Sequence, residues 1–531
     1  MASNGEGAVG VIGNGPVGQT TALLLARWGI PVVVLDNRPR RDAEGSRAIC
    51  QARDVLDVWA AVGAGRLADE GVTWTTARTF HRDRELFAWS FVDRGRSRLP
   101  ACVNISQVRT EQVLDQAIAA QPLIETRWAH EVVGIDQDEA GVTLRCRTSR
   151  GEVGLRVPYA VACAGARGEA VRRMLGVGFD GRSFDDRFLI CDIRVELPGW
   201  ETERRFYFDP EWNPDRQVLI HPCPDSTYRV DWQVPAGFDL DAEQAGGRLD
   251  ARIRQITGER RYEIVWKSVY RFHSRHADRF RVGRVLLAGD CAHLYAPFGA
   301  RGLNSGVQDA ENAAWKLAFV LRGWAPPALL SSYHAERLSA ALENLEVTSR
   351  TMDFLVPRSP AAWARRREVL ERAATDPASR DAIDSGRFSE HFWYVGSPLT
   401  TADPSRPFAG RPSRGETPVP APGVLVPDAP VRDPERPRVA QLREIVRNGL
   451  LALTCGRADA AGTALGLKRA TDAPARVLRL EDLDREGHLR GALRARDGEI
   501  WLLRPDGHVA AVVRDAAEVT AAARRALGNL L

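Results

Sequence analysis

The chain has 531 residues, 44% hydrophobic and 27% charged, which is ordinary for two or three globular domains and excludes disorder over the whole length. Its 73 Lys and Arg against 69 Asp and Glu give a net charge of +4, and no basic block is interleaved with aromatic residues, so nucleic acid is not an expected partner. No apolar run reaches the roughly 18 to 20 residues that span a bilayer, and the N-terminus lacks the layout of a secretion signal, so we expect a cytoplasmic protein that is not attached to a membrane.

The first predicted elements, between Val9 and Arg38, are a strand, a turn, a helix and a second strand, because a β-branched run ends in glycines and passes into apolar residues at helical spacing. The turn fits G-x-G-x-x-G, with the residues Gly13, Gly15, Pro16, Val17 and Gly18. Its glycines permit a tight turn, close approach of the backbone to a pyrophosphate, and contact between helix and strand. The N-terminus of such a helix binds phosphate through unpaired N–H groups.

Asp36 ends the second strand, 23 residues after Gly13, where a carboxylate can accept hydrogen bonds from a ribose hydroxyl. An acid at this point favours FAD or NAD over a cofactor with a 2′-phosphate, although Arg38 follows after Asn37. The chain has one such loop, so one dinucleotide is held in this way. A glycine turn in another kind of βαβ unit is the alternative.

The predicted secondary-structure pattern changes twice in the middle of the chain. Helix and strand patterns alternate up to residue 183, whereas residues 184–280 show short alternating runs typical of mostly antiparallel strands. The alternation of helix and strand patterns returns near Arg284. Residues 184–280 are therefore predicted to be an insertion in a domain made of residues 1–183 and 281–400. The strands of this insertion carry five polar or aromatic residues that could meet a substrate, on either face of the sheet: Tyr207, His221, Tyr228, Asp231 and Trp232.

The last part of the chain begins with a proline-rich linker, residues 401–438, in which ten of the 31 prolines fall. Residues 439–531 are predicted to form a small α/β domain. The eight cysteines of the chain include no C-x-x-C motif and no Cys/His cluster, so we expect reduced thiols and no metal site.

One segment, RVLLAGDCAHLYAPFGARGLNSGVQDAENAAWKLAFVLRG at 284–323, resembles the GD motif of the single-component (group A) FAD-dependent aromatic hydroxylases, the phenol hydroxylase-like flavoprotein monooxygenases. ISQVRTE at 105–111 is similar to the helix of that family whose glutamine, here Gln107, meets the flavin. GSRA at 45–48 is similar to its arginine position, here Arg47. The resemblance extends to the C-terminus, where residues 439–531 resemble the family's thioredoxin-like domain but lack C-x-x-C.

The resemblance implies an α/β fold: a doubly wound Rossmann-type FAD domain, an inserted and mostly antiparallel substrate domain, and a thioredoxin-like C-terminal domain. It also implies that Asp290 binds the ribityl chain and phosphates. The residues that would pass the isoalloxazine ring are Pro297, Gly299, Gly302, Leu303 and Asn304. Backbone N–H groups of the helix that begins there would favour the reduced, anionic flavin.

The implied reaction is hydroxylation of a small aromatic substrate, phenolic or of the polycyclic polyketide type. NAD(P)H reduces FAD, dioxygen gives a flavin C4a-hydroperoxide, and one oxygen passes to the ring. A phenol is activated by losing its proton, so a base is expected, with His221 the first candidate and Tyr228 the second. A Baeyer–Villiger-type oxygen insertion and a non-catalytic flavin-binding protein are the alternatives. Either NADH or NADPH could serve.

Two features leave alternatives open. Where the family has C-D-G-x-x-S, this chain has Cys163, Ala164 and Gly165 before A-R-G, and the missing carboxylate is associated with FAD and nicotinamide binding. We favour a lineage that holds the cofactor without it over an enzyme that NAD(P)H reduces poorly. The helix at 363–373 and the aromatic group at 391–394 are expected to cover the pocket or to contact a second subunit of a homodimer, with core packing as the alternative.

Overall fold

The structure is a computed structural model that describes residues 7–43, 45, 47–90, 97–412 and 418–529. Its central sheet has six strands in the order β17-β18-β11-β1-β2-β7, parallel except for β17 at one edge. These strands are β1 (Val9–Ile12), β2 (Val32–Leu35), β7 (Ile124–Arg127), β11 (Ala160–Ala162), β17 (Arg281–Val282) and β18 (Val285–Leu287). The four inner strands are fully buried, which explains why they read as continuous apolar runs.

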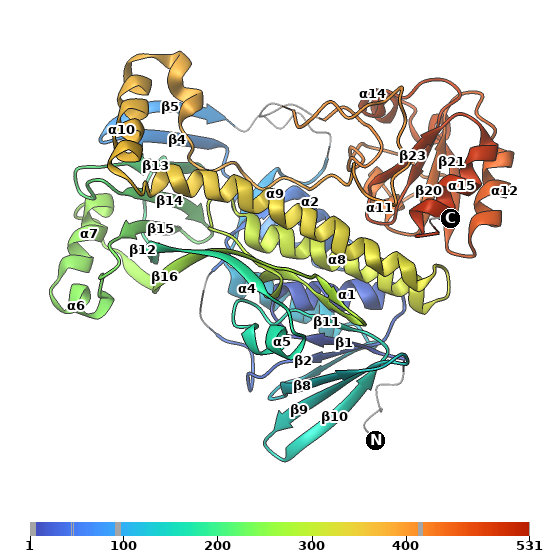
Figure 1. The fold of residues 1–531 in the computed structure, drawn as a ribbon. Helices are drawn as coiled ribbons and strands as arrows, with labels where there is room; N and C mark the ends of the chain where they lie inside the picture. The colour runs from blue at the N-terminus through green and yellow to red at the C-terminus, as the bar shows by residue number, and fades with distance from the viewer. Residues whose placement is uncertain (1–6, 44, 46, 91–96, 413–417, 530–531) are drawn as a thin grey trace.

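Helices cover one face of this sheet and a small second sheet covers the other (Figure 1). The helices are α1 (Pro16–Arg27), α4 (Gln107–Ala119) and α8 (Arg301–Leu321), with the shorter α2 (Arg53–Ala60), α3 (Leu67–Glu70) and α5 (Glu169–Met174) nearby. The small sheet is antiparallel and consists of β8 (Glu131–Gln137), β9 (Val142–Thr148) and β10 (Gly151–Val157). It lies so close to β1 that a Cβ on Gly10 would come within 2.9 Å of Leu144. The predicted α/β class with a Rossmann-type domain is confirmed.

The second large sheet has eight strands in the order β19-β16-β12-β15-β14-β13-β4-β5, all antiparallel neighbours except β13 and β4. They are β4 (Thr76–His81), β5 (Arg84–Ser90), β12 (Phe179–Arg194), β13 (Glu203–Phe208), β14 (Gln217–Cys223), β15 (Thr227–Val234), β16 (Glu263–Ala277) and β19 (His293–Leu294). The predicted insertion, residues 184–280, is therefore too narrow, because β4, β5 and β19 come from the flanking segments. Pairing between strands far apart in the chain leaves no mark on local sequence patterns.

The two faces of the eight-stranded sheet meet different surroundings. Helices α6 (Leu240–Ala245) and α7 (Arg248–Thr257) lie over an apolar cluster on one face, while the other face is turned toward the central sheet and α8. Helix α9 (Ser331–Leu355) runs along α8 and reaches β16, and α10 (Pro360–Thr375) lies against β4 and β5 (Figure 1). The predicted helix at 363–373 thus covers the edge strand β5 of this sheet and its neighbour β4.

The C-terminal part forms a separate four-stranded sheet in the order β21-β20-β22-β23, with α12 and α15 together on one side (Figure 1). Its elements are α11 (Leu442–Val446), β20 (Leu450–Thr454), α12 (Ala460–Ala470), β21 (Ala475–Arg479), α13 (Leu480–Leu483), α14 (His488–Leu493), β22 (Ile500–Leu503), β23 (Val509–Val513) and α15 (Ala516–Ala526). This agrees with the small α/β domain expected there, and its assignment as thioredoxin-like stays a prediction.

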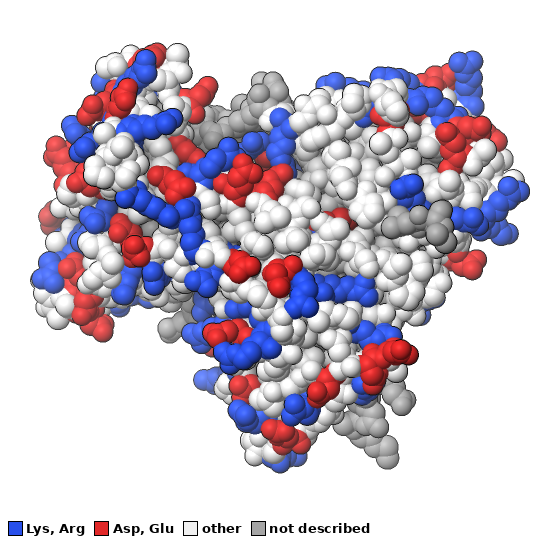
Figure 2. Space-filling view, in the orientation of Figure 1, with Lys and Arg blue, Asp and Glu red and all other residues white. Residues whose placement is uncertain are grey.

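The proline-rich segment packs against the C-terminal domain and is not a free linker. Its described residues contain no helix or strand, yet Ala421, Val424 and Val426 are buried, and Leu425 forms a bridge with His508 of the C-terminal domain. On the face drawn in Figure 2, basic and acidic side chains are intermixed rather than gathered by sign. Among the helices of the described residues, none combines the length and the apolar character that crossing a membrane requires.

Candidate active site

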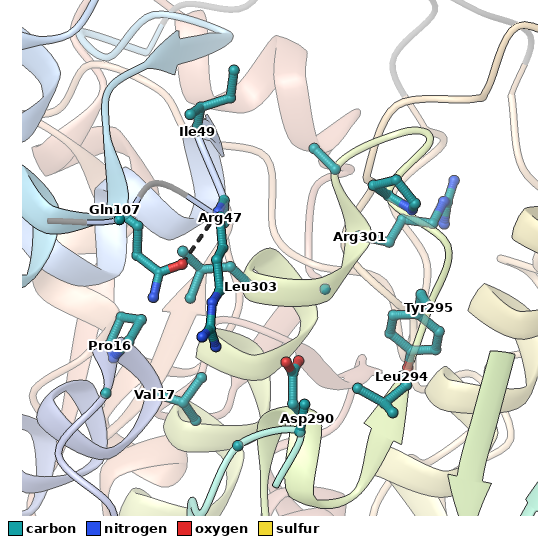
Figure 3. Close-up of a pocket in the computed structure, with 18 of the residues that line it drawn as sticks. Pro16, Val17, Arg47, Ile49, Gln107, Asp290, Leu294, Tyr295, Arg301 and Leu303 are labelled. Carbon is teal, nitrogen blue, oxygen red and sulfur yellow. Dashed lines mark hydrogen bonds between the residues drawn. The ribbon is translucent and has the colours of Figure 1, made fainter. Parts of the chain in front are cut away.

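A cavity of about 1300 Å³ lies where the carboxyl ends of the central strands face the eight-stranded sheet. It is larger than the roughly 300 to 1,000 Å³ of most single-ligand pockets, so it has room for a dinucleotide and a second molecule. In Figure 3, Pro16, Val17 and Gln107 line one side of this space, Tyr295 and Arg301 the other, and Leu303 lies between them. Segments that are far apart in the sequence therefore build one site.

The three glycines of the first loop have different surroundings. Gly13 has φ +107°, and a Cβ there would lie 2.3 Å from the carbonyl oxygen of Cys163. A Cβ on Gly18 would lie 1.9 Å from the carbonyl oxygen of Gly13, so this residue serves the contact of helix with strand. Gly15, at the N-cap of α1, has no atom within 4 Å of its Cβ position. It leaves open space in front of the helix N-terminus.

Asp36, at the end of β2, is held by its own neighbours. Its carboxylate accepts hydrogen bonds from the backbone N–H of Asn14 at 2.8 Å, from the backbone N–H of Arg38 at 2.9 Å and from Nε of Arg38 at 3.0 Å. Burial opposes the charged form, but these hydrogen bonds outweigh it and lower the pKa of Asp36 below its ordinary value. The carboxylate is therefore ionised, and it lies against the glycine loop that lines the cavity.

Asp290 lies opposite the first loop, in the turn after β18 (Figure 3). Figure 3 shows the side chain of Arg47 extending toward its carboxylate. Burial is the largest influence and raises the pKa of Asp290, although the charge of Arg47 opposes this shift. Next to Arg47, the backbone N–H of Ala48 donates to Oε1 of Gln107 at 3.2 Å. The arginine and glutamine segments, separate in sequence, thus meet at the cavity.

The cavity takes in most of the predicted cofactor residues: Gly13, Gly15, Pro16, Val17, Asp36, Asn37, Arg38, Arg47, Gln107, Asp290, Pro297, Gly299, Gly302 and Leu303. Gly18 and Asn304 do not line it. Asn304 instead bonds the backbone of the short strand β3 (Cys50–Ala52), accepting from the N–H of Ala52 at 2.9 Å and donating to the carbonyl of Cys50 at 3.0 Å. That strand pairs with β6 (Cys102–Asn104). Ser46 of the GSRA segment lies outside the described residues.

Strand alternation divides the five predicted substrate residues. His221 on β14 and Asp231 on β15 line the cavity. Tyr207, Tyr228 and Trp232 point to the opposite face, over which α6 and α7 lie. The hydroxyl of Tyr228 donates to the carbonyl of Leu197 at 3.4 Å, Trp232 is fully buried among apolar side chains, and the ring of Tyr207 stacks on Phe80 at 4.5 Å. The predictions that Tyr228 is a base and that Tyr207 and Trp232 bind substrate are therefore corrected.

The two residues that face the cavity are electrostatically unusual. Within the described part of the chain, neither Nδ1 of His221 nor Oδ1 of Asp231, both buried atoms, has a hydrogen-bond partner. Burial, with Arg204 and Arg229 nearby, lowers the pKa of His221 well below its ordinary value. Burial raises the pKa of Asp231 to about 7, against the charge of Arg229. Perturbed groups of this kind in a cavity are typical of functional sites.

The sequence analysis missed several residues of the same wall. Arg229 lines the cavity and pairs with Asp192, donating from Nη2 to Oδ2 at 3.1 Å. Aromatic and polar side chains of β12 and β16 complete the wall: Phe188, Trp266, Ser268, Tyr270 and Phe272. Period-2 spacing could have found Arg229, two residues before Asp231, once one residue of β15 was known to face inward.

Replacing Tyr228 with phenylalanine is expected to leave turnover and KM within about twofold of the wild type, because its hydroxyl makes one long bond on the far face of the sheet. Steady-state kinetics at several pH values would measure this. A decrease in turnover of tenfold or more would contradict this and show that the hydroxyl of Tyr228 takes part in catalysis. His221→Gln, on the cavity face, is the companion variant and is expected to impair turnover.

Comparisons with known proteins agree with this geometry. The FAD binding domain family matches residues 6–348, and the chain belongs to that family. A 3-(3-hydroxy-phenyl)propionate/3-hydroxycinnamic acid hydroxylase of Comamonas testosteroni is 31% identical over 73% of this chain and 65% of its own length. The chain thus spans slightly less than two thirds of that relative. Rifampicin monooxygenase of Streptomyces venezuelae is 32% identical over 70% of this chain and 77% of its own length.

Two solved structures share the fold over nearly the whole chain. The flavin-dependent monooxygenase PieE, in complex with FAD and substrate, has a TM-score of 0.84 at 22% identity and covers 98% of both chains. Aklavinone-11 hydroxylase, in a ternary complex with FAD and aklavinone, has a TM-score of 0.78 at 23% identity over 99% of this chain and 100% of its own. The likeness therefore includes the C-terminal part of the fold.

Proposed function

We propose that this chain is an FAD-dependent monooxygenase that uses NAD(P)H and dioxygen to hydroxylate an aromatic substrate, phenolic or of the polycyclic polyketide type. The observation that carries this proposal is one cavity shared by the dinucleotide loop, the Asp290 turn and the inward face of the eight-stranded sheet. When bound, FAD supplies the chemistry of hydride acceptance and oxygen activation. The residues of this chain would bind the cofactor, hold the substrate and accept its proton.

The residues present fit FAD. Gly15 leaves open space before the N-terminus of α1, and the side-chain amide atoms of Asn14 are buried without a partner among the described residues. A pyrophosphate there would receive helix N–H groups and the positive end of the dipole. Asp36 would accept from the adenosine ribose and Asp290 from the ribityl chain. Gly302 and Leu303, at the start of α8, would lie beside the flavin ring and favour its anionic reduced form.

His221 and Asp231 would receive the polar end of the substrate. Burial keeps the imidazole of His221 neutral, so a ring nitrogen can accept a phenolic hydrogen bond. Asp231 becomes a carboxylate above about pH 7 and can then take the phenol proton. Loss of this proton makes the aromatic ring electron-rich, which electrophilic attack requires. The aromatic wall of β12 and β16 would hold the ring itself.

The position of Ala164 keeps the alternatives open. This residue lines the cavity beside Gly13, so the departure from C-D-G-x-x-S falls inside the site. A Baeyer–Villiger-type insertion on the same scaffold and a non-catalytic flavin-binding role are the rival functions. A homodimer and a cytoplasmic location stay predictions from the sequence.

The test is a spectrum of the purified protein followed by anaerobic addition of NADH or NADPH, with and without phenols and polycyclic aromatics. Flavin bands that bleach faster with an aromatic, and a product that gains one oxygen with its carbon skeleton kept, would support hydroxylation. Ring expansion to a lactone would favour the Baeyer–Villiger route. A flavin that no nicotinamide reduces would overturn the enzyme proposal.

A pH profile tests the role of Asp231. Turnover is expected to rise through about pH 7 as Asp231 loses its proton, because the carboxylate is the form that accepts the phenol proton. Asp231→Asn should remove this rise and lower turnover about 100-fold, the low end of what one general base contributes. The charged groups that act on Asp231 are Arg229, Asp192 and Arg204. His221 lines the same cavity, so His221→Gln is measured beside it. An unchanged profile in Asp231→Asn would exclude it as the base.

A further inference from the structure

Within the part of the chain that the structure describes, the C-terminal domain supplies no side chain to the cavity. Among the described residues, the lining ends at Glu390, well before the first strand of this domain at Leu450. Yet the domain meets α8 and α9 through ionic groups that are almost completely buried, with Arg504 0% and Glu336 1% exposed. Buried charges of this kind are costly unless they are paired, so their arrangement calls for a physical explanation.

We propose that the C-terminal domain fixes the geometry and the reduction potential of the flavin through Glu336 and Arg337, two adjacent residues of α9. The proposal rests on the FAD binding of the proposed function. Arg337 holds the residues next to the cavity, and Glu336 is held by the C-terminal domain. Both are positioning residues, because neither lines the cavity.

On the flavin side, the centre of the network is Asp309 of α8, which is 0% exposed. Its Oδ2 accepts from the backbone N–H of Gly289 at 2.8 Å and lies 2.7 Å from Nε2 of His293. Gly289 directly precedes Asp290, so Asp309 holds the turn that presents this carboxylate to the cavity. The charge of Asp309 also acts at Asp290, where burial is the largest of several influences on the pKa.

Arg337 ties that turn to the start of α8. Its Nε donates to Oδ1 of Asp309 at 2.5 Å, and its Nη2 donates to the carbonyl of Ser305 at 3.1 Å and to Oγ of Ser305 at 3.0 Å. Ser305 comes two residues after Leu303, which lines the cavity. One guanidinium therefore sets the distance between the Asp290 turn and the helix N-terminus that would face the flavin.

The third arm of Arg337 reaches toward the C-terminal domain. Nη1 donates to the hydroxyl of Tyr394 at 2.9 Å, and the ring of Tyr394 lies against His508, with ring centroids 4.2 Å apart. Within the aromatic group at 391–394, His391 and Tyr394 are buried against His508 of the C-terminal domain, whereas Phe392 and Trp393 are partly exposed. Core packing, the alternative left open from the sequence, therefore describes two of the four residues. Tyr394 is buried and its backbone N–H donates to Gly423 at 2.7 Å, which anchors it to the proline-rich segment.

Glu336 forms a direct ion pair with the C-terminal domain. Arg504 donates to its carboxylate from Nη1 at 2.6 Å and from Nη2 at 3.0 Å, and Lys316 of α8 donates to it at 2.6 Å. Arg504 also pairs with Asp506. The cations Arg504, Lys316 and Arg337 balance the anions Asp506, Glu336 and Asp309 within this buried region. Removing one cation leaves surplus negative charge where water cannot screen it.

The test is Arg504→Met, with the reduction potential of bound FAD and its affinity as readouts. Surplus negative charge disfavours the reduced, anionic flavin, so the ratio of reduced to oxidised flavin at a fixed potential should fall about tenfold, roughly a 30 mV decrease for two electrons. FAD should also bind about tenfold more weakly. Tyr394→Phe removes a single bond to Arg337 and is the milder variant if Arg504→Met fails to fold; it should weaken FAD binding about threefold.

Arg406→Met is the matched control. Arg406 pairs with Glu499 at 2.7 Å, the two side chains being 4% and 0% exposed. Among the described residues, the hydrogen bonds of Arg406 go to Glu499 and to the carbonyl of Arg494 and not to α9. It should lower thermal stability and leave the flavin potential unchanged. An unchanged potential in Arg504→Met, or an equal shift in both variants, would overturn the proposal while FAD binding by the wild type stands. A wild type that binds no FAD would overturn the proposed function as well.

Discussion

Replacing Gly15 with valine is expected to give a folded protein that no longer retains FAD. The Cβ position of Gly15 has no neighbour within 4 Å, so the fold accepts a larger side chain there. The new methyl groups would occupy the space in front of α1 where a pyrophosphate must approach the backbone. Losing two charge-assisted hydrogen bonds of roughly 1.5 kcal/mol each means at least about 100-fold weaker binding.

The measurement is the flavin content of the purified protein and a titration with FAD, alongside the thermal midpoint of the FAD-free protein. Gly491→Val is the matched control, because the Cβ position of Gly491 is equally open but lies on the exposed side of helix α14, away from the cavity. It should keep both FAD and stability. A yellow Gly15→Val protein with ordinary FAD affinity would show that the dinucleotide does not lie against this loop.

Replacing Asp192 with alanine is expected to be the most destabilising single change in the wall of the cavity. Asp192 and Arg229 are cross-strand partners on β12 and β15, with side chains only 9% and 2% exposed. Removing the carboxylate takes away the ion-pair partner that the buried guanidinium of Arg229 bonds at 3.1 Å, and breaking a buried ion pair typically costs about 3 to 5 kcal/mol. Because Arg229 lines the cavity, substrate affinity should fall with stability.

Chemical denaturation and substrate binding of Asp192→Ala would measure both effects. The control is Arg194→Ala on β12, the strand that carries Asp192. It removes an exposed pair with Glu263 of β16 and should cost no more than about 1 kcal/mol. The double variant Asp192→Leu with Arg229→Met should be more stable than Asp192→Ala, since it buries no unpaired charge. A double variant as unstable as Asp192→Ala would mean that shape, not charge, makes the pair necessary.

The cofactor side of the site was predictable because its determinants are local. A glycine that needs positive φ, an open Cβ position before a helix and an acid at the end of the next strand all lie within Gly13 to Asp36. Such a βαβ unit is a continuous piece of chain whose geometry follows from short-range backbone constraints. The predicted GD segment is equally continuous, and most of its residues from Asp290 to Leu303 line the cavity.

The substrate side was predictable only in part. Adjacent residues of a strand point to opposite faces, so Asp231 and Trp232 could not both meet a substrate, but the inward face depends on which layer covers the sheet. Helices α6 and α7 cover the face with Tyr228 and Trp232, and this leaves His221, Arg229 and Asp231 to the cavity. The predicted limits of the substrate domain, residues 184–280, were too narrow for a related reason. Strand β4 lies outside these limits but pairs with β13, more than a hundred residues later in the chain.

Short continuous segments were enough to recognise the family and to predict the loops that line the cofactor side of the cavity, and the order of helix and strand patterns along the chain indicated the α/β class. The tertiary structure decided which strand face meets the cavity, and it brought Arg47 beside Asp290. It also placed Arg504 on Glu336, 168 residues away in the chain. The physical reason is that buried ion pairs and sheet faces are set by contacts between distant segments, and such contacts have no periodicity that a single sequence can display.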